Sequence, residues 1–132
     1  MNSSAPEGWV LDASALLAMI RSEPGGDRVT ELVSGAVLSA INWAEVVQKS
    51  IEHGTDISGL RQDLEAVGLA ILPFTAQHAE SAASLWSETR SAGLSLADRA
   101  CLAVARELGW PAVTADRSWK LLSLDIAMEH LR

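Results

Sequence analysis

Short runs of apolar residues alternate along the chain with longer segments in which apolar residues recur every three or four positions. Runs of three or four apolar residues are typical of buried strands, and the longer spacing is typical of amphipathic helices. We therefore expect strands at 9–11, 36–38, 69–72 and 112–114, with 126–128 as a candidate edge strand.

Helices are expected between these strands, because polar capping residues precede most of the periodic segments and glycines follow them. They cover residues 14–21, 27–33, 43–53, 55–67, 75–90 and 95–108, the third being capped by Ser39 or Asn42. This alternation predicts an α/β fold with a mostly parallel sheet and helices on both faces. No linker or repeat interrupts residues 1–132, so we expect a single domain.

Composition excludes several classes of protein. With 48% hydrophobic and 20% charged residues, the chain is not intrinsically disordered. Its single cysteine, Cys101, rules out an internal disulfide and a thiolate metal cage, and apolar neighbours indicate that it is buried. The N-terminal residues lack the order of a signal peptide, and the longest apolar stretch, 13–20, is too short to span a bilayer. We therefore expect a cytoplasmic protein with no membrane association.

The net charge is −7, from 10 Lys and Arg against 17 Asp and Glu. Proteins that bind nucleic acids chiefly by neutralising phosphates are basic, so this charge argues against such a protein. Four of the acids differ from the others because they lie within or next to apolar segments. They are Asp12, Glu45, Asp98 and Asp116.

The positions of these four acids predict that their carboxylates converge. Asp12 and Asp116 follow two expected strands, at the carboxyl end of each. Asp98 lies in the first turn of the helix at 95–108, and Glu45 lies about one turn into the helix after the second strand. Ligand sites in open α/β sheets lie outside the carboxyl ends of the strands, so all four side chains are expected near one edge.

Each acid also has a purely structural explanation. Ser95 and Asp98 have the spacing of a capping box, Asp12 suits a helix cap, Asp116 suits a turn, and Glu45 suits an exposed helix face. Taken together, however, clustered carboxylates repel and raise one another's pKa unless a cation compensates. Oxygen ligands without cysteine or convergent histidine suit Mg²⁺ or Mn²⁺, which support phosphoryl chemistry.

Four segments of the chain resemble the motifs of PIN-domain ribonucleases, particularly the toxins of VapBC-type toxin–antitoxin pairs. In order, they are VLDASALL at 10–17, SAINWAEV at 39–46, LSLADRACLA at 94–103 and VTADRSW at 113–119. One such motif would be weak evidence, but the four in this order cover nearly the whole chain. The resemblance implies a PIN-like three-layer sandwich with a central sheet of four to five strands.

The resemblance also implies an endoribonuclease that hydrolyses RNA phosphodiester bonds with Mg²⁺ or Mn²⁺, forms a homodimer and is silenced by a VapB-type antitoxin. Carried over by position, the catalytic residues are Asp12, Glu45, Asp98 and Asp116, and the metal ligands are Asp12, Asp98 and Asp116. Ser14 and Thr114 would add hydroxyl contacts to the metal or its waters.

Two other classes of protein stay open. A response-regulator receiver domain has a similar length and acids at its strand ends, although it normally carries paired acids where Asp12 stands alone. An inert PIN-like module that only binds a protein partner is the second class, and the presence of all four acids argues against it.

Two tryptophans also have competing interpretations. Trp86 lies on an apolar helical pattern and is expected in the core. Trp119 follows Asp116 closely and precedes Lys120, so it could stack on an RNA base. Packing is the interpretation we favour for Trp119, because tryptophan is highly buried on average.

Charge is distributed unevenly along the chain. Residues 1–89 carry 4 bases and 12 acids, whereas residues 90–132 carry 6 bases and 5 acids. Arg99, Arg117 and Lys120 stand beside two of the motif acids, where an RNA backbone would need positive charge, although solubilising surface charge explains them equally well. The acidity therefore does not exclude RNA, and it favours weak, metal-bridged binding and a basic partner peptide.

Overall fold

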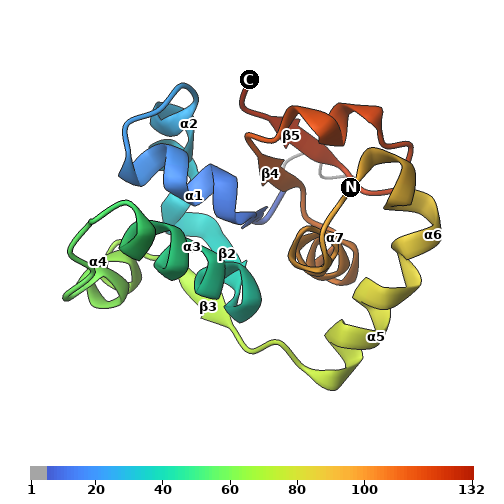
Figure 1. The fold of residues 1–132 in the computed structure, drawn as a ribbon, viewed down its shortest axis with the longest axis horizontal. Coiled ribbons are helices and arrows are strands. Elements are labelled where there is room, and N and C mark those ends of the chain that lie inside the picture. Colours follow the sequence, from blue (N-terminus) through green and yellow to red (C-terminus); the bar gives the residue numbers. More distant parts are fainter. Residues whose placement is uncertain (1–5) are drawn as a thin grey trace.

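The computed structural model describes residues 6–132, which form a five-stranded sheet with the strand order β3-β2-β1-β4-β5 (Figure 1). Its strands are β1 (Trp9–Leu11), β2 (Ala36–Ser39), β3 (Ala70–Leu72), β4 (Ala112–Thr114) and β5 (Met128–His130). Every neighbouring pair is parallel. The predicted α/β class is confirmed, and the edge strand lies two residues later than expected.

Seven α-helices and three short 3₁₀ helices connect the described strands. The α-helices are α1 (Ala13–Ile20), α2 (Gly26–Leu32), α3 (Ala40–Glu52), α4 (Leu60–Ala66), α5 (Ala76–Ser84), α6 (Trp86–Thr89) and α7 (Leu96–Leu108). The 3₁₀ helices are η1 (Val33–Gly35), η2 (Arg90–Ala92) and η3 (Arg117–Leu121). None of the helices in residues 6–132 is long and apolar enough to cross a membrane.

The prediction of one continuous helix at 75–90 is wrong, because the segment is divided at Leu85 into two helices, α5 and α6. Leu85 is buried, and the Ala82 carbonyl one turn before the break accepts a hydrogen bond of 3.0 Å from Arg99 Nη1. A side chain from α7 therefore supports the backbone where α5 ends. Apolar spacing within 75–90 carries no sign of this tertiary contact.

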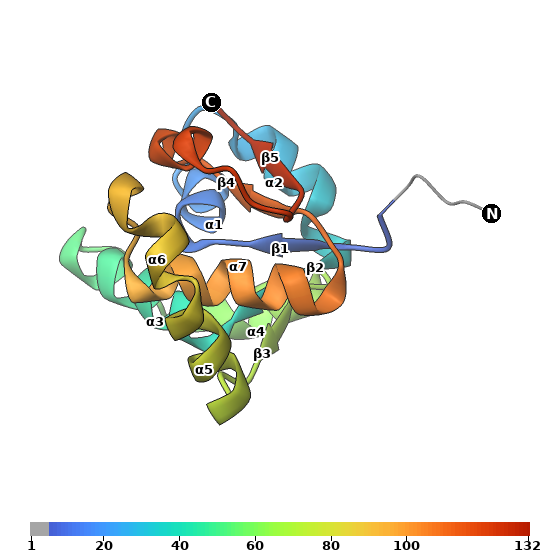
Figure 2. The ribbon, with the colours of Figure 1, turned by 90° about the vertical axis from the view of Figure 1, so that its right-hand side faces the viewer.

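The sheet separates two apolar clusters, because alternate residues of each strand point to opposite faces. Val10, Val37 and Ala112 face α7 and α5, whereas Leu11, Leu38 and Val113 face α1, α2 and α4. Figure 2 shows α7 running along one side of the sheet and α1 and α2 on the other. The three-layer arrangement predicted from the sequence is confirmed.

The strand order places a topological switch point between β1 and β4. From β1 the chain builds β2 and then β3 on one side, and it returns through α5 and α7 to place β4 on the other side. In open α/β sheets the carboxyl ends of strands at such a point border a crevice in which ligands bind. Asp12 and Asp116 follow the two strands that flank it.

The same strand order excludes one of the alternatives drawn from the sequence. Receiver-like sheets have the order 2-1-3-4-5, in which the third strand neighbours the first. Here β3 lies at the edge and β1 is flanked by β2 and β4. A receiver-like phosphoacceptor domain is therefore wrong for this chain.

Candidate active site

Asp12 occupies the junction between β1 and α1, and its side chain is the N-cap of α1. It is only 2% exposed and accepts hydrogen bonds from the Ala15 amide at 2.8 Å, from Ser14 Oγ at 2.8 and 2.9 Å, and from Thr114 Oγ1 at 2.5 Å. The cap is therefore Asp12, and Ser14 supports it. Thr114 lies at the end of β4, so these bonds cross the switch point.

Burial raises the pKa of the Asp12 carboxyl to about 6. The three donors Thr114, Ala15 and Ser14 each lower this pKa, and the nearby negative charge of Asp98 raises it. The desolvation cost therefore exceeds the stabilisation from all three hydrogen bonds. A buried carboxylate with a raised pKa next to a second acid is a common feature of functional sites.

Asp98 lies in the first turn of α7 and forms a capping box with Ser95. The Ser95 amide donates to Asp98 Oδ2 at 2.9 Å, and the Asp98 amide donates to Ser95 Oγ at 3.2 Å. The predicted capping role of Asp98 is thus confirmed. Capping does not account for the whole side chain, because Oδ1 takes no part in the box and the negative charge of Asp98 raises the pKa of Asp12.

Glu45 lies on α3, and the buried side chain of Asn42 on the preceding turn contacts it. Asn42 Nδ2 donates to the Ala97 carbonyl of α7 at 3.0 Å and lies 3.4 Å from Glu45 Oε1. Ser39 caps α3, so Asn42 is not the cap. Its role was not apparent from the sequence, where a cap explained it well enough.

Three of the four acids raise the pKa of one buried thiol, that of Cys101. Burial raises the pKa of this thiol, and the charges of Asp12, Asp98 and Glu45 raise it further. Cys101 itself is fully buried on α7 and is not positioned as a nucleophile. The charges of three of the predicted site acids, from the β1–α1 junction, α3 and α7, therefore reach the same buried position on α7.

Asp116 is joined to this group only through the backbone. Its amide donates to Thr114 Oγ1 at 3.0 Å, the hydroxyl that in turn donates to Asp12. One oxygen of the Asp116 carboxylate is engaged elsewhere, since Oδ1 caps η3 by accepting from the Ser118 amide at 2.9 Å and from Ser118 Oγ at 2.8 Å. The structural explanation thus accounts for Oδ1, and the role of Asp116 as a metal ligand stays a prediction.

The donor set has the chemistry of a site for a hard divalent cation. Its groups are carboxylates and hydroxyls, without cysteine or histidine, which suits Mg²⁺ or Mn²⁺. Within residues 6–132, however, no three acidic, histidine or cysteine side chains are gathered closely enough to hold a metal ion. One carboxylate oxygen of Asp98 is engaged in its capping box, and one carboxylate oxygen of Asp116 is engaged by Ser118. The residues therefore fit the cation by the type of their donor groups.

The basic residues near the site have different roles. Arg99 donates to the Ala82 carbonyl and therefore braces α5, which favours a structural role. Arg117 and Lys120 lie on η3 directly after Asp116, and both are exposed.

Trp119, which lies between Arg117 and Lys120, is fully buried and packs in the core, so the base-stacking alternative is wrong. Trp86 is 52% exposed and lies beneath Arg90, contrary to expectation.

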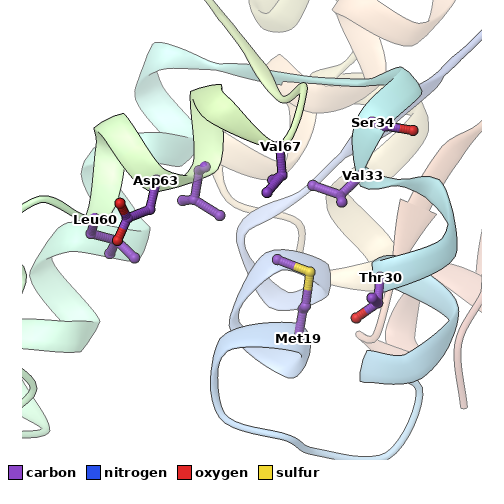
Figure 3. A pocket seen from close by; sticks show the side chains of 8 residues that line it. Met19, Thr30, Val33, Ser34, Leu60, Asp63 and Val67 are labelled. Atoms are coloured by element: carbon purple, nitrogen blue, oxygen red, sulfur yellow. The ribbon is translucent and has the colours of Figure 1, made fainter.

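A cavity of about 450 Å³ lies away from the four acids, none of which lines it. Figure 3 shows its lining side chains on α1, on the α2–η1 segment and on α4 and the residue that follows it, with those of Met19, Val33 and Val67 close to one another. They are Met19, Thr30, Val33, Ser34, Leu60, Asp63, Leu64 and Val67. The predominantly apolar lining is unsuited to phosphate chemistry, so this cavity is not the candidate active site.

A parallel α/β sheet with carboxylates and hydroxyls at its switch point defines the class of protein as an α/β protein with an acidic site. Residues 9–123 match the model of the PIN domain family, and the chain belongs to that family. No curated protein matches the chain in sequence.

Several solved structures share this fold. A chain of a toxin–antitoxin complex from Klebsiella pneumoniae is 19% identical with a TM-score of 0.69, over 85% of this chain and 90% of that one. A chain of DNA-bound VapBC from Salmonella typhimurium is 16% identical with a TM-score of 0.69, over 95% and 98%. A chain of FitAcB from Neisseria gonorrhoeae is 22% identical with a TM-score of 0.63, over 91% and 95%.

Proposed function

We propose that residues 1–132 form a single nuclease domain, and that the protein is a Mg²⁺- or Mn²⁺-dependent endoribonuclease acting as the toxin of a toxin–antitoxin pair. The observation that carries this proposal is the buried Asp12 carboxylate at the switch point between β1 and β4, where it accepts hydrogen bonds from Ser14 Oγ and Thr114 Oγ1. The Asn42 side chain links Glu45 to the first turn of α7, which carries Asp98. PIN domains are generally nucleases, and family membership supports the same reaction class. The acidic, oxygen-rich site supports phosphodiester hydrolysis over other chemistries.

In this proposal the four acids have different tasks. Asp12 and Asp98 hold the cation, because Asp12 is a buried carboxylate at the switch point and the negative charge of Asp98 acts on it, a repulsion that a bound cation would offset. Asp116 is a further ligand if its carboxylate is released from Ser118. Glu45, half-buried and contacted by Asn42, is placed to take a proton from the attacking water. When bound, the cation would lower the pKa of water and offset charge on the phosphate.

The partners follow from the same proposal. The substrate is RNA, and a cognate VapB-type antitoxin restrains the enzyme, as the toxin–antitoxin complexes with this fold suggest. We further propose a homodimer and a cytoplasmic setting. The excess of acids in residues 1–89 favours a partner segment that is basic.

The test of this proposal is cleavage of purified total RNA with Mg²⁺ or Mn²⁺ and with EDTA. We expect metal-dependent cleavage by the wild-type protein and a loss of at least about 100-fold in Asp12→Asn and Asp98→Asn. The matched control is Asp56→Asn, an exposed aspartate that caps a turn through the Ser58 amide, which asparagine does equally well. Full activity in either site variant overturns the assignment of the acidic site, and no activity in the wild type overturns the proposed function and favours the inert PIN-like module.

A further inference from the structure

Asn42 is the buried polar residue of the acidic site that the proposed mechanism leaves without a task. Its side chain has no exposed surface, and it lies on α3 one turn before Glu45. A fully buried amide in a core position is unusual unless its hydrogen bonds are satisfied. Here the nitrogen is satisfied and the oxygen is not.

The nitrogen of Asn42 joins the two helices that carry acids. Nδ2 donates to the Ala97 carbonyl at 3.0 Å, and Ala97 is the residue directly before Asp98 in the first turn of α7. The same nitrogen lies 3.4 Å from Glu45 Oε1. One amide group therefore relates the position of Glu45 to that of the α7 N-terminus.

The oxygen of Asn42 has no hydrogen-bond partner among residues 6–132. The donation to the Ala97 carbonyl fixes which end of the amide is the nitrogen, so the unpaired atom is an acceptor. Other buried polar atoms without a partner are Ser50 Oγ, Arg99 Nε and Trp119 Nε1. Of the four, Asn42 Oδ1 belongs to the side chain that contacts a site acid.

We propose that Asn42 is a positioning residue of the acidic site: its nitrogen sets Glu45 and the first turn of α7 relative to each other, and its oxygen accepts a hydrogen bond from water held there. This inference rests on the proposed function. Residues that orient ligands in this way typically account for 10–100-fold in metal affinity or activity.

The test uses Asn42→Leu, which keeps a similar volume and removes both polar atoms. If Asn42 only joined α3 to α7, leucine would lower stability by removing the bond to the Ala97 carbonyl but would leave the Mn²⁺ affinity of the folded protein unchanged. We expect instead that Mn²⁺ affinity, measured by electron paramagnetic resonance, falls about 10-fold or more. We also expect kcat for RNA cleavage to fall more than KM rises, and amide exchange in the first turn of α7 to accelerate.

Ser50→Ala is the matched control, because Ser50 is a buried residue of the same helix whose hydroxyl also lacks a partner. It should leave Mn²⁺ affinity and kcat at wild-type values. Asn42→Ser provides a second variant with less risk of overpacking, and the same losses are expected from it.

The outcomes separate this inference from the proposed function. Wild-type protein that binds Mn²⁺ without cleaving RNA overturns the function, while Mn²⁺ affinity in Asn42→Leu still decides the role of Asn42. Unchanged Mn²⁺ affinity in a folded Asn42 variant overturns the inference, as does a wild-type chain that binds no Mn²⁺.

Discussion

Asp12 combines two properties that oppose each other at the scale of a single residue. It caps α1 and receives three kinds of donor, which favour its charged form, yet its burial disfavours that form more strongly. In the absence of a cation, the folded protein therefore carries an unfavourable charge at neutral pH. The cost disappears when the carboxyl is protonated or when positive charge is bound beside it.

Asp12→Asn should therefore stabilise the protein in EDTA at pH 7.5. Asparagine removes the buried charge and keeps the shape, and the Ser14 and Thr114 hydroxyls can rotate to accept from its amide. The pKa difference between about 6 in the folded state and 3.8 in the unfolded state sets an upper limit of about 3 kcal/mol. Urea unfolding of both proteins measures the difference, which we expect to lie between about 1 and 3 kcal/mol.

The pH dependence of the free energy of unfolding tests independently whether the Asp12 charge is destabilising. Because the pKa of Asp12 is raised, the folded state keeps a proton between pH 3.8 and about 6 that the unfolded state releases. The wild-type free energy of unfolding therefore falls through this window as pH rises, and the contribution is absent from Asp12→Asn. Equal stabilities of the two proteins at pH 7.5 in EDTA would contradict this account of Asp12.

Single residues also show where sequence reasoning succeeds and fails. The four acids were identifiable because polar residues within apolar segments are uncommon. The burial of Trp119 confirms the packing interpretation, whereas Trp86, expected in the core, is half-exposed. Trp86 lies on α6, a helix of four residues that is too short for apolar periodicity to reveal which face is inside. Asn42 was identifiable as a match to the family motif, but its bond to Ala97 was not, since the two residues lie 55 positions apart.

At the scale of elements, α5 and α7 begin in the same way. Each opens with a capping box, formed by Thr75 with His78 in α5 and by Ser95 with Asp98 in α7. Such a box satisfies two backbone amides at a helix N-terminus. In α7 the box also includes a candidate ligand, so the stability of this turn and the placement of Asp98 depend on the same bonds.

Ser95→Ala should separate these two effects. Loss of the hydroxyl that accepts from the Asp98 amide costs about 1 kcal/mol of stability and loosens the first turn of α7. We expect Mn²⁺ affinity to fall several-fold as a consequence. Thr75→Ala removes the matching cap of α5, which carries none of the four acids, and should cost similar stability without changing Mn²⁺ affinity. Equal effects of the two substitutions on Mn²⁺ would show that the α7 cap has no special role.

Elements were predictable where local pattern determined them. β1, β4 and α7 lie where the apolar spacing placed them, since each is buried and bounded by polar residues or glycine. β5 lies two residues further on, because it is an edge strand whose position depends on pairing with β4 and not on its own apolar content. The break at Leu85 likewise depends on Arg99, which is remote in sequence.

For the whole molecule, the net charge of −7 limits how RNA can bind. Arg99, next to Asp98 in the sequence, is engaged, because it donates to the Ala82 carbonyl and braces α5. Arg117 and Lys120 are exposed on η3, next to Asp116. We therefore expect few phosphate contacts and a shallow dependence of RNA affinity on salt.

Arg117→Gln and Lys120→Gln test this expectation in an Asp12→Asn background that does not cleave the RNA. With about two phosphate contacts, the slope of log K against log salt for a single-stranded RNA should be about −1.4. Each substitution should reduce its magnitude by about 0.7, as measured by fluorescence anisotropy between about 50 and 200 mM salt. Arg61→Gln on α4, where Arg61 pairs with Glu65, is the control and should leave the slope unchanged. A slope that all three substitutions leave unchanged would mean that RNA contacts this molecule elsewhere, and that the excess of bases in residues 90–132 serves solubility alone.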